Sequence, residues 1–199
     1  MSSPLEMTTD LLRIAYSNGY FPMPEQDSGQ IMWLSPDPRA IFPLDGFHVS
    51  RSLARTLKKV PFTYSINKAF MDVMEGCGDR KDTWINQQFK DTYHALHKEG
   101  DAHSIEVWLG EKLVGGLYGV SFKGAFFAES MFHRETGASK AAIHYLITYM
   151  KTRQMRLLEV QFLTPHLVSL GAIAIPRKQY LIKLKQALSA PTSFLDGVV

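Results

Sequence analysis

The segment HSIEVWLGEKLVGGLYGVSFKGAFFAESMF, residues 103–132, predicts three consecutive β-strands that are joined by two tight turns. A glycine inside a strand weakens it, so Gly115 and Gly116 indicate a bulge or a close approach by another backbone or a ligand. Because Glu129 follows on the third strand, this sheet is a candidate binding surface. A plain meander whose glycines only relieve crowding is an equally good interpretation of the segment.

Helical and extended patterns continue on both sides of this meander. Capping residues and apolar spacing predict helices at residues 8–18, 50–60, 68–77, 86–98 and 139–153, and another helix from Pro176. Further strands are expected at 62–66 and 156–162, whereas the proline-rich residues 20–47 are expected to be mostly loop. The helix at 139–153 is a crossover, which makes the strands before and after it parallel neighbours. The predicted fold class is therefore α/β of the α+β type, with a mixed sheet and helices on both faces.

The composition is that of an ordinary globular protein with one main domain. The chain has 199 residues, of which 45% are hydrophobic and 21% charged, so a sizeable core can form. The formal charge of +3 is too small to indicate nucleic-acid binding by itself. The single cysteine, Cys77, excludes an internal disulfide and is typical of a reducing compartment. No secretory signal or membrane-spanning run is visible in the sequence, so a cytoplasmic protein is expected.

Several short motifs that lie far apart in the chain occur together. They are GYFPM at 19–23, MWLSPDPRA at 32–40, HVSRSL at 48–53, TWI at 83–85, HSIEVW at 103–108, LVGGLYGV at 113–120, ESMF at 129–132, SK at 139–140 and SLGAIAIPR at 169–177. In this combination and order the chain resembles the leucyl/phenylalanyl-tRNA–protein transferases, the bacterial aminoacyltransferases of the N-end rule. The resemblance covers roughly residues 10–188, and no single motif would carry it alone.

The resemblance implies a fold, a reaction and partners. The catalytic core of the family is similar to the GCN5-related N-acetyltransferases, and a small N-terminal domain precedes it. For this chain it implies a reduced N-terminal appendage at 1–46, a catalytic domain at 47–190 and a flexible tail at 191–199. The implied reaction moves Leu or Phe, and Met more weakly, from aminoacyl-tRNA to the N-terminal amine of proteins that begin with Arg or Lys. The product is marked for degradation, and no metal, organic cofactor or membrane is implied.

The family motif D-x-Q corresponds here to Glu159-Val160-Gln161, with glutamate in place of aspartate. Two residues apart on a strand, Glu159 and Gln161 would share one face. The resemblance implies that Glu159 orients the Gln161 amide and holds the incoming ammonium, while Gln161 accepts a hydrogen bond from the attacking amine. From the residues alone, Glu159 is an ordinary solvated strand residue. Glu129 of ESMF would bind the donor amino group or a cationic acceptor side chain, and a structural hydrogen bond to backbone N–H groups is the alternative.

The donor amino acid and the tRNA need further contacts. The resemblance assigns to the substrate site Leu117, Phe126, Ile143, Leu146, Met150, Leu158 and Ser169. It assigns to the terminal adenosine of the tRNA Trp33 and Trp84, and to the tRNA stem the basic helix face of Arg51, Arg55, Lys58 and Lys59. An apolar pocket of this kind would accept Leu, Met and Phe and reject the β-branched Val and Ile. Each set also has an ordinary interpretation, the apolar residues and tryptophans as core and the charged run as a solvated face.

Two other functions remain open on this sequence. An acyl-CoA-dependent N-acetyltransferase of the same fold would bind pyrophosphate through [QR]-x-x-G-x-[GA], which residues 134–139 nearly match. Ser139 breaks the last position of that motif, and Glu135 would put an anion beside the phosphates. A catalytically inactive RNA-binding module would keep the basic helix and the tryptophans without needing Glu129 or Gln161. Transfer of Leu from charged tRNA separates the three functions in one assay.

Overall fold

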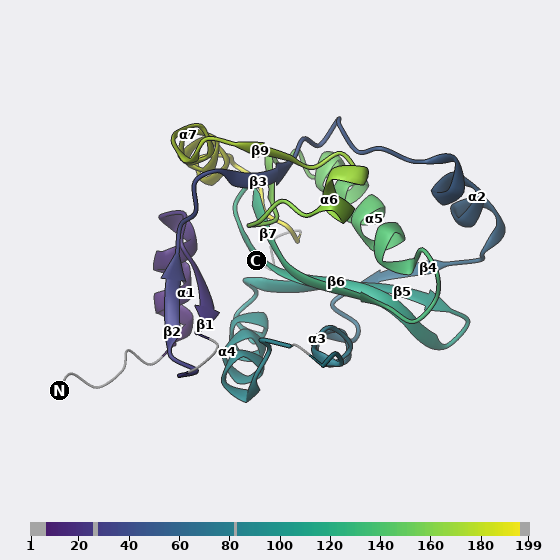
Figure 1. Cartoon of the computed structure of the whole chain (residues 1–199), viewed down its shortest axis with the longest axis horizontal. Helices are drawn as coiled ribbons and strands as arrows, with labels where there is room; N and C mark the ends of the chain where they lie inside the picture. The colour runs from purple at the N-terminus through teal and green to yellow at the C-terminus, as the bar shows by residue number, and fades with distance from the viewer. Residues whose placement is uncertain (1–6, 26–27, 82, 196–199) are drawn as a thin grey trace.

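A computed structural model describes residues 7–25, 28–81 and 83–195, and its centre is a seven-stranded mixed sheet in the order β4-β5-β6-β7-β8-β3-β9 (Figure 1). The strands of this sheet are β3 (Arg39–Phe42), β4 (Thr63–Ile66), β5 (Ala102–Leu109), β6 (Lys112–Phe122), β7 (Ala125–His133), β8 (Leu157–Glu159) and β9 (Ile173–Ile175). A separate hairpin is formed by β1 (Phe21–Pro24) and β2 (Ile31–Leu34). The helices are α1 (Thr9–Ser17), α2 (Arg51–Lys59), α3 (Phe70–Gly78), α4 (Gln87–Lys98), α5 (Ala138–Thr152), α6 (Pro165–Ser169) and α7 (Arg177–Leu188). The predicted α/β class with a mixed sheet is confirmed.

The meander of β5, β6 and β7 is confirmed, and one of its glycines marks a close backbone approach. A Cβ on Gly116 would lie 2.6 Å from the carbonyl oxygen of Ile105, which is too close for any side chain. The register between β5 and β6 shifts between Val107 and Trp108, as expected for a bulge. The neighbour that requires glycine here is therefore the protein's own backbone.

Two apolar clusters cover the two faces of the sheet. Figure 1 shows α3 and α4 on one side of the sheet and α5 on the other, which confirms helices on both faces. The first cluster joins α1, α3, α4 and α7 to the sheet through residues such as Tyr93 and Phe127. The second joins α2, α5 and α6 to the opposite face through Leu53, Leu146 and Leu167. The apolar residues that recur at helical spacing in the sequence are thus the ones that these helices bury against the sheet.

The crossover through α5 is confirmed, because β7 and β8 are parallel neighbours. The strand predicted at 156–162 is shorter than expected, since β8 ends at Glu159. Gln161 lies two residues beyond this end with φ at 56°, in the left-handed region, so the extended backbone does not reach it. The expectation that Glu159 and Gln161 share one strand face is therefore wrong.

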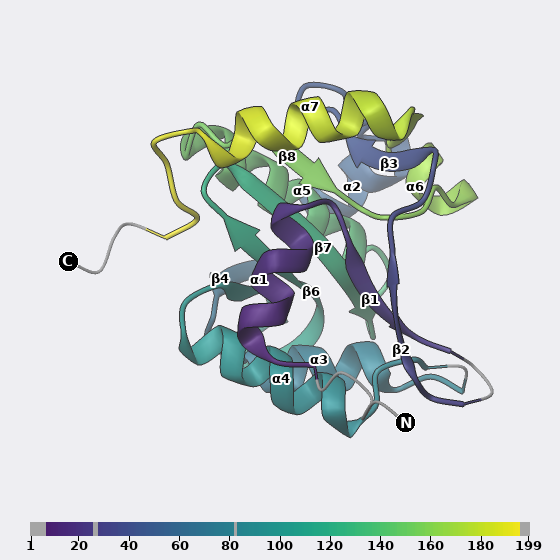
Figure 2. The same ribbon diagram turned by 90° about the vertical axis from the view of Figure 1, so that its left-hand side faces the viewer.

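The N-terminal segment holds more regular structure than its prolines predict. The stretch predicted as loop contains the strands β1 and β2, which form a hairpin that Figure 2 shows beside α1, and then β3. Because β3 pairs with β8 and β9, the main sheet begins before the boundary predicted near residue 46.

The C-terminal segment is also more ordered than the sequence predicts. In the predicted flexible tail at 191–199, Phe194 is buried with its ring centroid 5.0 Å from that of Phe126. Residues 196–199 lie outside the described part. Among the described helices, none has both the length and the apolar character to cross a membrane.

Candidate active site

An opening in the sheet lies between β7 and β8. The two strands pair at only three positions, after which β7 continues to His133 while the chain beyond β8 turns away. A cavity of about 90 Å³ occupies this opening. That space exceeds the roughly 10–15 Å³ that a single water molecule needs. Ligand sites of α/β sheets commonly lie where neighbouring strands end in this way.

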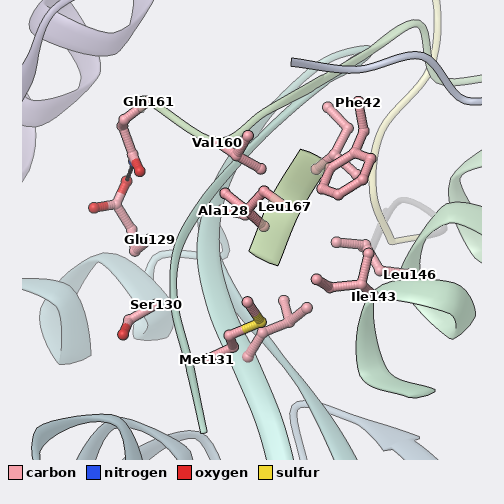
Figure 3. Close-up of a pocket in the computed structure, with 12 residues that line it drawn as sticks. Phe42, Ala128, Glu129, Ser130, Met131, Ile143, Leu146, Val160, Gln161 and Leu167 are labelled. Carbon is pink, nitrogen blue, oxygen red and sulfur yellow. Dashed lines mark hydrogen bonds between the residues drawn. The ribbon is translucent and has the colours of Figure 1, made fainter. Parts of the chain in front are cut away.

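Apolar side chains form most of the cavity wall. The residues that line it are Phe42, Leu117, Ala128, Glu129, Ser130, Met131, Ile143, Leu146, Leu158, Val160, Gln161 and Leu167 (Figure 3). Leu117, Ile143, Leu146 and Leu158 are pocket residues that the sequence predicts, and all four line the cavity.

Two other predicted pocket residues belong to the core instead. Phe126 and Met150 have no exposed surface and do not line the cavity. Phe126 packs against Phe194, and Met150 lies one helical turn beyond Leu146 on α5. This corrects the prediction for both, because an apolar stripe on one element can face the cavity at one end and the core at the other.

Five apolar wall residues were not identified from the sequence, and two of them, Ala128 and Met131, lie on β7 on either side of Glu129. Phe42 lies in β3, within the stretch predicted as loop, and the apolar run at 40–42 is the one local signal that indicates a buried strand here. Leu167 lies in the short helix α6, and Val160 follows directly after β8. These last two reach the cavity through the path of the chain after β8, which no local pattern predicts.

On the polar side of the opening, Glu129 is the centre of a hydrogen-bond network. The Tyr16 hydroxyl donates to Glu129 Oε1 at 2.6 Å, and Gln161 Nε2 donates to the same oxygen at 2.9 Å. The hydroxyls of Tyr93 and Tyr16 are 2.5 Å apart. Because Tyr16 gives its proton to Glu129, Tyr93 is the donor to Tyr16. Figure 3 shows Glu129 and Gln161 turned toward each other, with the apolar wall on the other side of the strands.

The protonation of this network is set by its burial. Burial raises the pKa of Glu129 to about 8, although the hydrogen bond from Tyr16 lowers it and the charge of Glu159 raises it further. Burial also raises the pKa values of Tyr16 and Tyr93 well above that of an ordinary tyrosine, so both stay protonated as donors. A carboxyl group with a pKa near neutrality beside a cavity is a candidate catalytic or binding group.

The sequence indicated only part of this network. Glu129 was identified through the ESMF motif, whereas the two tyrosines were not assigned to the site. The signal for Tyr93 is its inward position on the predicted helix at 86–98. The sequence around Tyr16 gives no such signal, because a tyrosine near the end of a helix can equally well be an ordinary core residue.

Glu159 lies behind the site and not in it. Its Oε1 accepts from Arg39 Nε at 2.7 Å and also from the backbone N–H of Gln161. Glu159 therefore contacts the backbone of Gln161 and not its side-chain amide. With 0% of its surface exposed, Glu159 can neither hold an incoming ammonium nor be a solvated strand residue. Both sequence interpretations of Glu159 are corrected, and its role in the structure is to hold the turn that carries Gln161.

The tryptophans and Ser169 lie outside the cavity wall. Trp33 in β2 and Trp84, just before α4, are half-buried and pack against the same apolar cluster as Tyr16. The ring of Trp84 meets that of Phe89 edge-on, with centroids 5.2 Å apart. Ser169 is exposed, and its hydroxyl donates a hydrogen bond to the carbonyl of His166 in the same short helix, α6. Ser169 therefore does not line the cavity.

The basic residues predicted for the tRNA stem lie together on α2. Ser50 caps this helix by accepting from the N–H of Leu53, which is its buried anchor. Four cations face outward and are exposed: Arg51, Arg55, Lys58 and Lys59. The ion pairs found within the described part of the chain involve none of them. Figure 1 places α2 at one end of the molecule, where an anionic partner can reach it.

The residues before α5 are those that an acyl-CoA-dependent acetyltransferase would use for the coenzyme pyrophosphate. Gly137 precedes α5 with φ at 86°, and a Cβ on it would lie 2.9 Å from Thr56 Cγ2. Because Thr56 belongs to α2, this helix lies beside the turn at which α5 begins. Within residues 7–25, 28–81 and 83–195, no three His, Cys, Asp or Glu side chains lie close enough together to hold a metal ion.

Comparisons with known sequences agree on one protein family. The family model described as leucyl/phenylalanyl-tRNA protein transferase matches residues 41–185, and the model of its N-terminal domain matches residues 6–37. A leucyl/phenylalanyl-tRNA–protein transferase of Ruegeria sp. is 47% identical over 193 residues, covering 96% of this chain and 92% of the relative. One from Cereibacter sphaeroides is 49% identical over 193 residues, covering 96% and 90%.

Solved structures show weaker likeness. L-PGS from Bacillus licheniformis matches at 14% identity with a TM-score of 0.44, covering 80% of this chain and 55% of that one. The aminoglycoside acetyltransferase meta-AAC0020 from a soil metagenome matches at 13% identity with a TM-score of 0.39, covering 69% and 92%. Both scores are low, so the sequence matches alone carry weight here.

Proposed function

Because this chain belongs to the leucyl/phenylalanyl-tRNA protein transferase family, we propose that it moves Leu or Phe, and Met more weakly, from aminoacyl-tRNA to the N-terminal amine of proteins that begin with Arg or Lys. It is an aminoacyltransferase that uses aminoacyl-tRNA, as its family is. The proposal further holds that the reaction takes place in the cytoplasm and marks the acceptor protein for degradation.

The observation that carries the proposal is that an apolar cavity and a polar network share one opening in the sheet. A Leu or Phe side chain fits the apolar side, which leaves its amino group and its ester at the boundary where Glu129 and Gln161 lie. The adenosine of the tRNA then lies toward α1 and α4, on the face that carries Trp33 and Trp84. Stacking on an aromatic ring contributes about 1–3 kcal/mol per base.

The reaction itself needs no energy source beyond the donor ester. The acceptor amine attacks the ester carbonyl, a C–N bond forms, the C–O bond to the ribose breaks, and the ribose oxygen takes up a proton. An α-amine has an ordinary pKa of about 7.7–8.0, so part of it is already deprotonated at neutral pH. The protein must therefore orient the amine, accept a hydrogen bond from its N–H group and hold the donor ester in place.

Glu129 and Gln161 have complementary roles in this geometry. Since Gln161 Nε2 donates a hydrogen bond to Glu129, the Oε1 atom of Gln161 is left to accept a hydrogen bond from the attacking amine. Glu129 in its carboxylate form binds the ammonium group of the donor amino acid, which lies two bonds from the ester carbonyl. An apolar cavity, a carboxylate and a carboxamide are thus each matched to one part of the aminoacyl ester.

A transfer assay tests the proposal directly. Radiolabelled Leu-tRNA is incubated with a peptide that begins with Arg, with its N-acetylated form and with the same peptide beginning with Glu. Leu is expected on the free Arg peptide only. Absence of transfer, or acetylation of the peptide from acetyl-CoA under the same conditions, would contradict the proposal and favour one of the other two functions.

The rate of Leu transfer at saturating substrates should rise with pH and level off above about 8, because the proposed role of Glu129 requires its carboxylate and its pKa is about 8. Tyr16→Phe should shift this rise to higher pH, since the hydrogen bond from Tyr16 lowers the pKa of Glu129. Rate profiles of both proteins with one acceptor peptide check this. The peptide amine titrates identically in both, so an unshifted profile would contradict the role of Glu129.

The basic face of α2 should control the salt dependence of tRNA binding. The double variant Lys58→Ala, Lys59→Ala is expected to weaken binding and to reduce the slope of log K against log salt by about 0.7–0.9 per lost phosphate contact. Binding titrations over a salt series measure this slope. The matched control is Lys178→Ala, Lys183→Ala on α7, which removes the same charge at another exposed place. Equal slopes for both double variants would show that the salt dependence comes from the total charge of the protein and not from contacts between α2 and the tRNA.

A further inference from the structure

A buried arginine lies directly behind the candidate site. Arg39 in β3 and its partner Glu159 both have 0% of their side-chain surface exposed. Burial lowers the pKa of Arg39, but the charge of Glu159, its hydrogen bond and the nearby Tyr180 and Tyr16 together raise it above the ordinary value, so the guanidinium stays charged. A buried ion pair commonly stabilises a protein no better than apolar residues of the same size, because both charges lose their water. This pair therefore requires a reason other than stability.

The guanidinium of Arg39 makes two hydrogen bonds and two ring contacts, while its Nη2 has no hydrogen-bond partner among the described residues. Its Nε donates to Glu159 Oε1 at 2.7 Å, and its Nη1 donates to the carbonyl of Gly19 at 2.9 Å. Its Cζ lies 4.7 Å from the ring centroid of Phe21 and 4.5 Å from that of Tyr180. These partners come from β8, the turn after α1, β1 and α7, so one side chain joins four segments.

The first of these contacts controls Gln161. Glu159 Oε1, which Arg39 binds, also accepts the backbone N–H of Gln161. The Gln161 carbonyl accepts from the N–H of Ala40, the neighbour of Arg39, at 3.1 Å. Gln161 needs this support because its φ of 56° is unfavourable for a residue other than glycine. The turn that aims its carboxamide at Glu129 is thus fixed by the ion pair.

The second contact controls Tyr16. This residue lies in the last turn of α1, and Gly19 forms the turn that ends the helix. The Arg39 bond to the Gly19 carbonyl therefore fixes the end of α1 relative to β3. Tyr16 and Gln161 are the two donors to the same oxygen of Glu129. Tyr16 and Gln161 therefore both lie next to residues that Arg39 holds by hydrogen bonds, namely Gly19 and Glu159.

We propose that Arg39 is the positioning residue of this site. It orients Gln161 through Glu159, and it orients Tyr16 through Gly19. Arg39 does not line the cavity, so it acts through these residues and not on the substrate. The expected effect on the rate rests on the proposed function, whereas the expected effect on the orientation of Gln161 does not.

Arg39→Lys is the first test. Lysine keeps the charge but cannot make the two fixed hydrogen bonds or stack between two rings. We expect kcat for Leu transfer to fall by up to about a hundredfold while KM for aminoacyl-tRNA is unchanged, because misplacement of about 1 Å can cost that much. The side-chain amide resonances of Gln161 should shift in the NMR spectrum of the variant. The control is Arg156→Lys, an exposed arginine directly before β8, which should change neither quantity.

A second variant separates positioning from folding. Arg39→Met combined with Glu159→Leu removes both buried charges together, so no lone charge is left in the core. We expect this protein to melt close to the parent and still to have the reduced kcat. Full activity in the double variant, or unshifted Gln161 resonances together with unchanged kcat in Arg39→Lys, would overturn the inference. If the parent protein transfers no Leu, the proposed function fails, and the Gln161 resonances still decide whether Arg39 positions this residue.

Discussion

Gln161→Asn is expected to lower kcat for Leu transfer by about a hundredfold or more and to leave KM for aminoacyl-tRNA almost unchanged. The asparagine amide is one methylene shorter, so it cannot keep the 2.9 Å bond to Glu129 and also meet the attacking amine. The loss concerns the amine in the transition state and not the binding of tRNA, so it should appear in kcat. Single-turnover measurements with preloaded Leu-tRNA separate the two quantities.

Asparagine is the preferred replacement because of the backbone at this position. Gln161 has φ at 56°, and asparagine adopts this left-handed conformation more readily than alanine does. A loss of activity in Gln161→Asn therefore reports the length of the side chain and not a rearranged turn. Gln161→Gly, which relieves the backbone and removes the amide, should lose at least as much.

The chain provides a matched control for this prediction. Gln154 also has a left-handed backbone, with φ at 55°, and it is exposed in the turn after α5. Gln154→Asn makes the same chemical change in the same backbone conformation away from the cavity, and it should keep full activity. Equal rates for Gln161→Asn and Gln154→Asn would sink the catalytic role of Gln161.

The parts of the fold that could be predicted from the sequence are those with strong local signals. The meander of β5 to β7 is marked by turn glycines, and α2 and α4 begin at the capping residues Ser50 and Asn86. The crossover of α5 follows from the order of elements alone. By contrast, β3 and β9 are short strands that pair with each other, and β3 also pairs with β8; no local sequence pattern predicts such pairing.

The candidate site divides in the same way. Motifs located Glu129 and Gln161, and apolar spacing located Ile143 and Leu146 on one face of α5. The direction of the Gln161 side chain could not be predicted, because strand periodicity fails where the backbone becomes left-handed. The partner of Glu159 was equally hidden, since an arginine in a proline-rich stretch is expected on the surface and not in the core.

Filling the cavity from Ala128 is expected to abolish Phe transfer before Leu transfer. Ala128 lines the cavity from β7 and is only half-buried, so a larger side chain there can occupy the open space without forcing the core apart. In the series Val, Leu and Phe at position 128, Phe-tRNA should lose kcat/KM first because its side chain is larger. Each excluded methylene costs about 10–200-fold. Binding of uncharged tRNA should stay unchanged throughout.

Met150→Leu is the matched control, because Met150 lies on α5 near the cavity but is wholly core. This swap conserves volume and should cost less than about 1.5 kcal/mol of stability while leaving the ratio of Leu to Phe transfer unaltered. Ala128→Phe must also melt within a few degrees of the parent, so that loss of transfer reports a filled cavity and not unfolding. If the Ala128→Phe variant still transferred Phe at the parental rate, the donor side chain would have to bind elsewhere. The opening between β7 and β8 would then not be the site of the reaction.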